Sequence, residues 1–273
     1  MNPCNRCDFF LTRLTIVILG ILTISLWGAE PKTNQTSATS TSNSQKAPNG
    51  AAVTYPGTSG KTRLFIFSGQ SNMVGLKPNT TVMPFVRKAF PDDELVAVTV
   101  AEGGKPIRLW YKSWKDANGK ESGLPQGELY DRLLAEVQVA TKDKHLHSLV
   151  FLWMQGETDG REANSSEVYE KSLTGLIQQM RTDLKRTDLG VVLGRISDCK
   201  MELASWKQIR KVQETVATAD PRARWFDTDD LNGPRNEIHY TNDGYVELGK
   251  RFAEKAIELL LLPSIAPPKV PRK

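Results

Sequence analysis

Cysteine is scarce in this chain of 273 residues, and its distribution excludes a fold held together by disulfides. Cys4 and Cys7 form a C-x-x-C pair, a spacing that can bind a metal or support redox chemistry, but both precede the apolar run of an export signal. We therefore assign them to that signal. Only Cys199 is left in the exported part, so no intrachain disulfide can form there and stability must come from an apolar core.

Blocks of basic residues are also missing, although the net charge is +5 and the pI is about 9.0. Lys and Arg alternate with Asp and Glu along the chain, and the densest basic stretch, residues 269–273, is typical of a frayed tail. Without a basic stripe that includes aromatic residues, we expect no nucleic-acid partner. The sequence has no G-x-G-x-x-G motif either, which argues against a Rossmann-type nucleotide site.

A long hydrophobic run occurs only near the start of the chain. Residues 14–27 are apolar and follow Arg6 and Arg13, the pattern of an export signal. The run has about 15 residues, fewer than the roughly 20 that a bilayer span needs. Cleavage is expected after Ala29, but Trp27 is a poor residue three positions before a cleavage site. An uncleaved N-terminal membrane anchor is therefore the alternative.

The remaining composition predicts one folded domain between two disordered segments. Residues 30–60 are rich in Ser, Thr, Asn, Gly and Pro and contain few large apolar side chains, which predicts a disordered linker. The domain is expected to span residues 61–262, and the Pro-rich residues 263–273 form a tail. No internal repeat is visible, and the sequence indicates no oligomeric state.

Within the domain, short apolar runs alternate with amphipathic stretches, which is typical of an α/β fold with a parallel sheet covered by helices. The runs are continuous in Val, Ile, Leu and Phe, as strands buried on both faces are. Five strands are predicted, at residues 64–67, 95–100, 149–154, 190–196 and 224–227.

Apolar residues at helical spacing mark the buried faces of the helices between these strands. The last helix is predicted over residues 243–261, with Val246, Leu248, Phe252, Ile257 and Leu260 buried. The other stripes are Leu129, Leu133, Leu134 and Val137; Leu173, Leu176, Ile177 and Met180; and Trp206, Ile209, Val212 and Val216.

Ser71 is the candidate nucleophile. It stands in the segment Ser68-Gly69-Gln70-Ser71-Asn72-Met73, directly after the first predicted strand. A glycine-containing turn at a strand end lifts the following side chain out of the sheet, and Gly69 gives the backbone freedom to make that turn. This placement predicts a serine hydrolase if the chain also supplies a base.

His239 is the candidate base among only three histidines. A serine hydroxyl needs a base to take its proton, and histidine is the usual one. His239 lies in the loop between the fifth strand and the last helix, at the same sheet edge as Ser71, where sites of open parallel sheets are built. A turn or capping role is the alternative for His239, whereas His145 and His147 are expected to be solvated loop residues.

Two further segments follow strands at that edge. Gln155 and Glu157 come after the third strand; the amide of Gln155 can donate hydrogen bonds, and the carboxylate of Glu157 can orient an imidazole. Gly103 and Gly104 come after the second strand. Their N–H groups can stabilise an oxyanion, or the two glycines simply end the strand.

In this order, these segments resemble the SGNH hydrolase superfamily, in particular the sialate O-acetylesterase domain and carbohydrate esterase family 6, which contains acetylxylan esterases. The resemblance covers about 200 residues. It rests on four segments: residues 69–73; Gly103 and Gly104 with Ile107 and Trp110; Trp153 with residues 155–157 and Asp159; and His239 ahead of Gly244, Tyr245, Leu248 and Gly249.

The resemblance implies a three-layer α/β/α flavodoxin-like fold and serine-dependent deacetylation of sugar hydroxyls, without a metal or other cofactor. Ser71 would attack the acetyl carbonyl and His239 would act as the base. The oxyanion hole would comprise the N–H of Ser71, an N–H of Gly103 or Gly104, and the Gln155 side chain. Asn72, Trp110 and Asp159 would contact the substrate.

One position departs from the family pattern. The superfamily commonly has Asp three residues before the histidine, where this chain has Asn236, and an amide cannot neutralise an imidazolium. Loss of the orienting carboxylate of a serine protease costs about 10⁴ in rate. The resemblance makes Glu157 the expected substitute, because some members of the esterase family use the glutamate of this segment. Asp227, Asp229 and Asp230 are the other candidates.

Two functions follow from these residues. The first is an exported carbohydrate O-acetylesterase acting on an acetylated polysaccharide or on sialic acid. The second is a catalytically impaired sugar-binding protein of the same fold, suggested by Asn236 and by Trp110, Tyr111 and Trp114, which could stack on sugar rings or pack beneath the loop. The α/β-hydrolase fold fits less well, because its nucleophile lies midway along the sheet in G-x-S-x-G.

Overall fold

The computed structural model describes residues 52–263 of the chain. The predicted signal or anchor at residues 1–29, most of the predicted linker and the tail after residue 263 lie outside the described residues. None of the helices between residues 52 and 263 has the length and apolar character that a bilayer crossing requires.

The described chain forms a mixed α/β structure around a six-stranded sheet with strand order β1-β3-β2-β4-β5-β6. Neighbouring strands from β3 to β6 pair in parallel, and β1 pairs antiparallel to β3. The strands are β1 (Ala52–Tyr55), β2 (Thr62–Gly69), β3 (Glu94–Ala101), β4 (Leu146–Met154), β5 (Gly190–Gly194) and β6 (Ala223–Phe226). The five predicted strands are confirmed as the parallel part of the sheet.

Strand β1 corrects two predictions. It adds a sixth strand, and it lies in residues 30–60, where we predicted a disordered linker. Its residues Ala52 to Tyr55 pair with Val98 to Leu95, and alternate residues are exposed. An edge strand of this kind is held by backbone hydrogen bonds to one neighbour, so it forms without the large apolar side chains whose absence indicated a linker.

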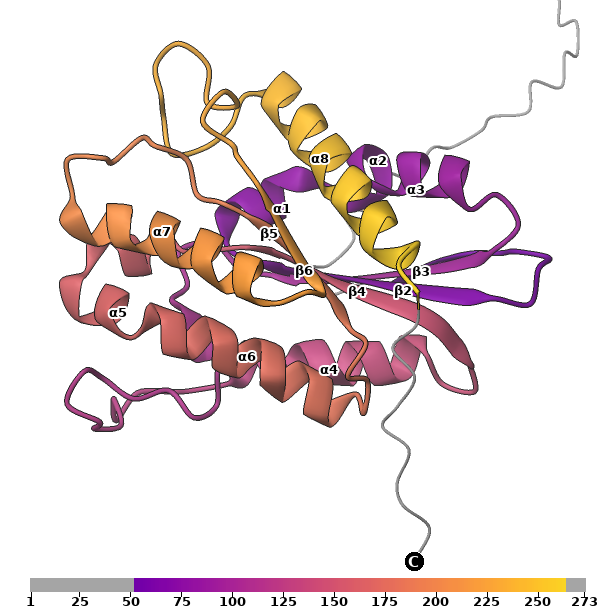
Figure 1. Ribbon diagram of the computed structural model, residues 1–273, viewed down its shortest axis with the longest axis horizontal. Coiled ribbons are helices and arrows are strands. Elements are labelled where there is room, and N and C mark those ends of the chain that lie inside the picture. Colours follow the sequence, from indigo (N-terminus) through magenta and orange to yellow (C-terminus); the bar gives the residue numbers. More distant parts are fainter. Residues whose placement is uncertain (1–51, 264–273) are drawn as a thin grey trace, which may run out of the picture. The chain divides into compact units, whose positions relative to one another are not determined.

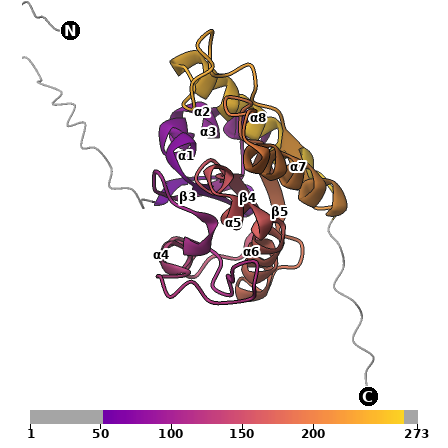
Figure 2. The ribbon, with the colours of Figure 1, turned by 90° about the vertical axis from the view of Figure 1, so that its left-hand side faces the viewer.

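Between residues 52 and 263, eight helices connect and cover the strands. They are α1 (Ser71–Leu76), α2 (Pro78–Thr81), α3 (Met83–Ala89), α4 (Glu128–Ala140), α5 (Ala163–Glu167), α6 (Tyr169–Asp183), α7 (Ala204–Ala219) and α8 (Asn242–Leu260), with short 3-10 turns η1 (Ile107–Leu109) and η2 (Asp159–Arg161). Figures 1 and 2 show α2, α3 and α8 on one face of the sheet, and α4 and α6 on the other. Helix α7 packs beside α6. The three-layer arrangement agrees with the predicted fold class.

The core lies on both faces of the central strand β2. Leu64, Phe65, Ile66 and Phe67 are fully buried there, and burying a side chain of this kind contributes about 1.5–3 kcal/mol. The predicted helix stripes are largely buried as well. Val246 is an exception: 53% of it is exposed, so α8 turns this residue away from the sheet while Leu248 and Phe252 pack inward.

The register of the central strands brings three strand ends to one level. Gly69 at the end of β2 pairs with Ala101 at the end of β3 and with Met154 at the end of β4. The segments that follow these three residues therefore leave the sheet side by side.

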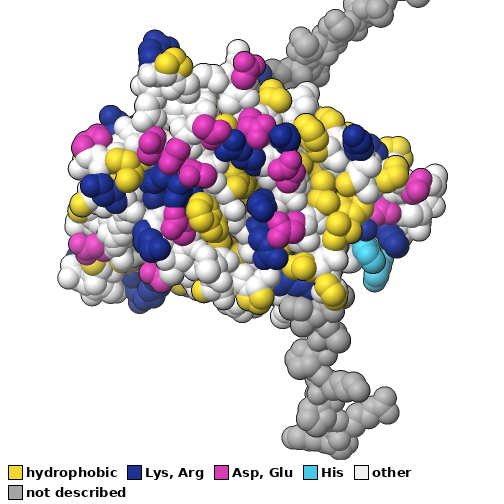
Figure 3. All heavy atoms as spheres, turned by 45° about the horizontal axis from the view of Figure 1, so that its top comes forward, with side chains coloured by type: hydrophobic (Ala, Val, Ile, Leu, Met, Phe, Trp, Pro, Cys, Tyr) yellow, Lys and Arg dark blue, Asp and Glu magenta, His cyan; other side chains and the backbone are white. Residues whose placement is uncertain are grey.

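The surface carries mixed charge. On the face shown in Figure 3, Lys and Arg side chains are interspersed with Asp and Glu. Ion pairs on the surface of the described chain include Arg224 with Glu258, and Arg251 with Asp230 and Glu247.

Candidate active site

The site begins at a backbone turn that requires glycine. Gly69 has a φ of +144°, and a methyl group placed on it would lie 1.9 Å from the Met154 carbonyl oxygen. The next residue, Gln70, donates its N–H to the same oxygen at 2.9 Å. The chain thus crosses the end of β4 in close contact, and this crossing directs Ser71 into the first position of α1.

Ser71 and His239 are brought together as predicted. Ser71 Oγ and His239 Nε2 are 3.0 Å apart, a hydrogen-bond distance. His239 is exposed and Ser71 is half-buried, so the pair is open to solvent on one side.

The loop that carries His239 is fixed at its far end by the start of α8. Thr241 caps this helix: its hydroxyl accepts a hydrogen bond from the N–H of Gly244 at 3.0 Å. The N–H of Thr241 donates to the Leu231 carbonyl at 3.1 Å, which closes the loop. His239 is therefore held two residues before Thr241, the residue that caps the helix.

Asn236, three residues before His239, does not orient the imidazole. It is exposed, it has a left-handed backbone with φ of +46°, and its N–H donates to the Gly233 carbonyl. Within residues 52–263 its side chain makes no hydrogen bond to His239. The upstream acids are engaged elsewhere: Asp227 with Arg195, Asp229 with Arg195 and Arg210, and Asp230 with Arg251.

Glu157 is placed differently from the prediction. Only 1% of it is exposed, and its Oε1 accepts a hydrogen bond from Asn72 Nδ2 at 2.7 Å. Its Oε2 is buried and has no partner among the described residues. Burial raises the pKa of this carboxyl group above its ordinary value. No hydrogen bond joins it to His239, which corrects the expectation that Glu157 orients the imidazole directly.

Gly103 lies beside Ser71, as the prediction requires. A methyl group on Gly103 would lie 3.6 Å from Ser71 Cβ, and both Gly103 and Gly104 are exposed in the turn after β3. Gly104 has a left-handed backbone with φ of +70°. In the described part of the chain neither N–H group donates a hydrogen bond, so both are free to meet an incoming oxygen.

The Gln155 side chain is not an oxyanion donor in this structure. It is fully buried, and its Nε2 donates to Asp159 Oδ2 at 2.5 Å and to the Lys105 carbonyl at 3.1 Å. Its Oε1 accepts a hydrogen bond from the Tyr169 hydroxyl. The amide is committed to the protein interior, which corrects the predicted role.

Asp159 binds the backbone of the loop after β3 and is buried beneath it. Its Oδ2 also accepts the N–H of Ile107 at 3.0 Å, so Asp159 and Gln155 together hold residues 105–107. The other oxygen, Oδ1, is buried without a partner among the described residues. Burial raises the pKa of Asp159 to about 7.

The other predicted substrate contacts are also internal. Asn72 is 1% exposed and Trp110 is fully buried, with its Nε1 donating to Ser68 Oγ at 2.8 Å. Trp114 is buried too, and Tyr111 is half-buried against Gly175 of α6. Trp110 and Trp114 therefore pack in the interior and are not placed to stack on a sugar, whereas Tyr111 lines a hollow beside α6.

A hollow of about 430 Å³ lies next to His239 and was missed in the sequence. Arg235 and Glu237 form its charged wall and are joined by an ion pair at 3.3 Å. Asn232, Pro234, Tyr240, Thr241 and Asn242 complete the lining. All of these residues flank His239 in the chain, so proximity to the predicted base was the signal that could have found them.

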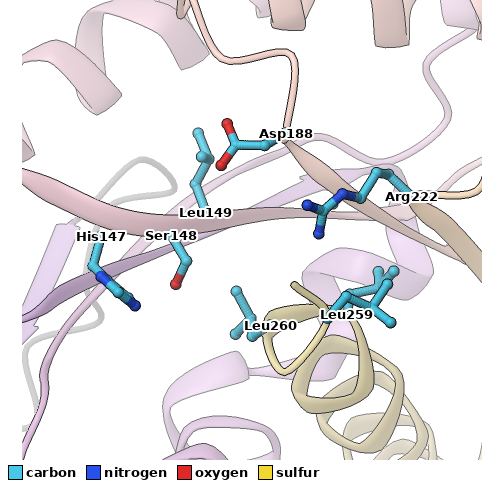
Figure 4. Close-up of a pocket in the computed structure, with 9 residues that line it drawn as sticks. His147, Ser148, Leu149, Asp188, Arg222, Leu259 and Leu260 are labelled. Carbon is cyan, nitrogen blue, oxygen red and sulfur yellow. The ribbon is translucent and has the colours of Figure 1, made fainter. Parts of the chain in front are cut away.

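A second hollow lies at the other end of the parallel strands, where β4 and β5 begin (Figure 4). His147, Ser148 and Leu149 from β4 line it together with Arg222 and the end of α8. His147 thus belongs to β4 and not to the preceding loop, although it is exposed as expected. Because this hollow adjoins the amino ends of the strands, it is remote from Ser71.

Metal ligands are not grouped in residues 52–263: no cluster of three or more His, Cys, Asp or Glu side chains is placed to hold an ion. The Cys199 thiol is free and half-buried.

Comparison with known protein families shows to which family this chain belongs. Residues 81–258 match the family model described as carbohydrate esterase, sialic acid-specific acetylesterase. The chain belongs to this family. The match includes Gly103, Glu157 and His239 and begins after Ser71. Membership in this carbohydrate esterase family places the protein among hydrolases of acetyl esters on carbohydrates.

Solved structures share the fold of this acetylesterase family member at low sequence identity. A protein from Arabidopsis thaliana has a TM-score of 0.56 and 18% identity, covering 72% of this chain and 97% of its own. A carbohydrate acetylesterase from Xanthomonas citri has a TM-score of 0.52 and 17% identity, covering 73% of this chain and 56% of its own. The protein NanS has a TM-score of 0.51 and 11% identity, covering 75% and 98%. Among curated proteins, no sequence matches this chain.

Proposed function

We propose that this protein hydrolyses acetyl esters on sugar hydroxyls by a serine mechanism in which Ser71 is the nucleophile and His239 the general base. The observation that carries the proposal is the 3.0 Å distance between Ser71 Oγ and His239 Nε2. A serine within hydrogen-bond reach of an imidazole, on a glycine turn at the carboxyl edge of a parallel sheet, is the arrangement that acyl transfer needs.

The reaction proceeds in two halves. Ser71 Oγ attacks the acetyl carbonyl carbon while His239 Nε2 takes the hydroxyl proton. The tetrahedral intermediate then breaks its bond to the sugar oxygen, which receives that proton from His239, and an acetyl-Ser71 ester remains. Water attacks this ester while one of its protons passes to His239. The bond between the acyl carbon and Ser71 Oγ then breaks, Ser71 recovers that proton from His239, and acetic acid leaves. The net reaction consumes one ester and one water and yields the sugar alcohol and acetic acid.

Backbone N–H groups supply the oxyanion hole in this proposal. No side chain caps the amino end of α1, so the N–H of Ser71 is free to donate. Gly103 supplies the second N–H in this proposal, because a methyl group on it would lie 3.6 Å from Ser71 Cβ. Removing one such donor typically costs about 10²–10³ in kcat. Gln155 has no part in this hole because its amide is engaged elsewhere.

The proposed site works as a pair and not as a triad. Among the described residues, the His239 side chain has a hydrogen-bond contact with Ser71 alone. The imidazolium that forms during the reaction is then stabilised by solvent at the exposed ring. A site of this kind is expected to be slower than one with a carboxylate behind the histidine, and it still provides general-base catalysis of about 10²–10⁴-fold.

An acetate-release panel tests the proposal. The purified protein is mixed separately with acetylated xylan, acetylated pectin, 9-O-acetyl sialic acid and an aryl acetate, and free acetate is measured over time. We expect release from at least one carbohydrate, its loss in Ser71→Ala, and its retention in Ser113→Ala, which removes an exposed serine away from the pair. Equal release by wild type and Ser71→Ala would refute the serine mechanism.

The lack of a carboxylate on His239 favours one second candidate, a sugar-binding protein with an impaired site. Calorimetric titration with the same carbohydrates distinguishes the two. Saturable binding without acetate release supports the second candidate, and release abolished by Ser71→Ala excludes it.

We also propose that the chain is exported, on the basis of Arg6, Arg13 and the apolar residues 14–27. Amino-terminal sequencing of the protein from an exported fraction tests this. A new N-terminus after Ala29 supports cleavage, an intact N-terminus in the membrane fraction supports an anchor, and protein confined to the cytosol contradicts both.

A further inference from the structure

Asn72 joins three parts of the fold through one buried side chain. Its Nδ2 donates to Glu157 Oε1 at 2.7 Å and to the Ile238 carbonyl at 3.0 Å. Its Oδ1 accepts a hydrogen bond from the Tyr245 hydroxyl at 3.0 Å. Both N–H donors of the amide are thus used, and the side chain is held in one orientation.

Two of the residues in this network are sequence neighbours of the proposed catalytic pair. Asn72 directly follows Ser71, and Ile238 directly precedes His239. The hydrogen bond from Asn72 to the Ile238 carbonyl therefore links the residue after the proposed nucleophile to the residue before the proposed base. It is a cross-link between α1 and the loop ahead of α8 that runs parallel to the Ser71–His239 contact.

We propose that Asn72 is a positioning residue that holds the His239 loop against Ser71, and that Glu157 acts on catalysis through Asn72 and not on the imidazole. This inference rests on the proposed function, since it explains how the two reacting side chains keep their geometry. It also gives Glu157 a role that agrees with its burial and with its hydrogen bond to Asn72.

The cross-link matters because the other hydrogen bonds of the loop, such as those of Thr241 and Tyr240, do not reach α1. Residues 233–237 are all exposed, and so is His239. Within the loop, Asn232 Nδ2 donates to the Glu237 carbonyl, which shapes the loop but does not tie it to α1. The pair of Ser71 and His239 is itself a single exposed hydrogen bond, too weak to order a loop of this length.

Glu157 and Tyr245 are placed to fix the orientation of the Asn72 side-chain amide. Glu157 is buried at the end of β4, so its carboxylate oxygen is a fixed acceptor for one N–H of the amide. Tyr245 lies on α8 with its ring against α1: a methyl group on Gly75 would be 2.3 Å from that ring. With an acceptor on one side and a donor on the other, the amide cannot rotate without losing both contacts.

Isosteric substitutions separate this role from direct stabilisation of the imidazolium. In Glu157→Gln the amide oxygen still accepts from Asn72, so the cross-link survives while the charge is lost. We expect kcat to fall by less than about tenfold, whereas loss of a carboxylate that acts on the histidine costs about 10⁴-fold. In Asn72→Asp the shape is kept, but no donor remains for Glu157 or for the Ile238 carbonyl. We expect kcat to fall by about 10²-fold or more with KM changed little, because misplacement of about 1 Å has that effect.

The double variant N72D/E157Q exchanges donor and acceptor between the two side chains. The new amide can donate to the new carboxylate, which restores the link between positions 72 and 157 but not the link to Ile238. We expect thermal stability to recover toward wild type while kcat stays low. Recovery of kcat together with stability would show that the Ile238 contact is irrelevant and would overturn the proposal.

The experiment compares wild type with N72D, E157Q and N72D/E157Q, and uses Ser71→Ala and Ser113→Ala as controls. For each protein it measures kcat, KM, the unfolding temperature and the rate at which a fluorophosphonate labels Ser71. Labelling needs the serine and its base but no sugar, so it separates the two proposals. If wild type releases no acetate but is labelled at Ser71, the substrate assignment fails and the cross-link is judged on labelling rates. The proposed cross-link would be contradicted if N72D were labelled as fast as wild type, or if kcat fell about 10⁴-fold in E157Q. A wild-type protein that is neither active nor labelled would contradict it as well.

Discussion

Ser71 Oγ and His239 Nε2 lie 3.0 Å apart although 168 positions separate the two residues in the chain. The contact joins the turn after the central strand β2 to the loop that enters α8. Because neither side chain is part of the buried core, each is available for chemistry without a large cost in stability when it is replaced.

The first prediction concerns the interdependence of this pair. Ser71→Ala and His239→Ala should each lower kcat by at least about 10³-fold, and the double variant should be no slower than either, because residues that act as a unit are strongly non-additive. Acetate release measures the rates. Unfolding temperatures within a few degrees of wild type are the control, and multiplicative losses in the double variant would contradict a shared step.

The second prediction concerns the buried carboxyl group of Asp159. Burial raises its pKa to about 7 from an ordinary value of 3.8, so the folded state binds a proton more tightly than the unfolded state. Stability is then lost as the pH rises from about 4 to about 7. Asp159→Asn removes this dependence and keeps an acceptor for Ile107 and Gln155.

Chemical denaturation at several pH values tests whether the free energy of unfolding falls as the pH rises. Relative to Asp159→Asn, the wild type should lose free energy of unfolding between about pH 4 and 7. The difference is on the order of 1.4 kcal/mol per unit of pKa shift, and so a few kcal/mol in total. A difference between the two proteins that stays constant with pH would show that Asp159 is not protonated in the folded state.

The third prediction compares two glycines with left-handed or related backbones. Gly60 has φ of +73° in open space, whereas Gly69 has φ of +144° and its added methyl group would meet Met154 at 1.9 Å. Gly60→Ala should therefore cost about 1–2 kcal/mol from backbone strain alone. Gly69→Ala should cost more than about 3 kcal/mol or prevent folding, because rigid backbone blocks the methyl group. Equal losses at the two positions would contradict the close crossing of β4.

The fourth prediction concerns Trp110, which is fully buried and donates to Ser68 Oγ. Trp110→Phe leaves a space and removes that donor, so the free energy of unfolding should fall by about 1–3 kcal/mol. KM for the acetylated carbohydrate should stay within about threefold of wild type, since one lost hydrogen bond to a substrate costs more than that. An unchanged stability with a raised KM would indicate sugar stacking instead.

The parallel part of the fold could be predicted because strands covered on both faces are continuous apolar runs, as at Leu64 to Phe67. The helices could be predicted because their buried faces repeat at helical spacing, as at Leu173 and Ile177. Strand β1 could not, since an edge strand is stabilised by backbone pairing with β3, which leaves little trace in four residues. Val246 was misplaced because the pattern of α8 is apolar over more than one face.

For the site, sequence reasoning identified residue types better than it identified contacts. Ser71 and His239 met as predicted because the topology of a parallel sheet brings strand ends together. Glu157 was predicted to orient His239, Gln155 to donate to the oxyanion and Asp159 to contact the substrate, yet all three side chains are buried and bonded to the protein interior. Which way a polar side chain points after a strand depends on partners far away in the chain, such as Asn72 for Glu157, and no local pattern records them.

The order of the site along the chain has a consequence during synthesis. Ser71 follows β2, the first strand of the parallel set, while His239 precedes α8, the final described helix. A ribosome therefore releases the serine long before the histidine. On the proposed mechanism, a chain interrupted anywhere between them has the hydroxyl without its proton acceptor, and we expect a partly made protein to be inert toward esters until its last helix is ready to dock.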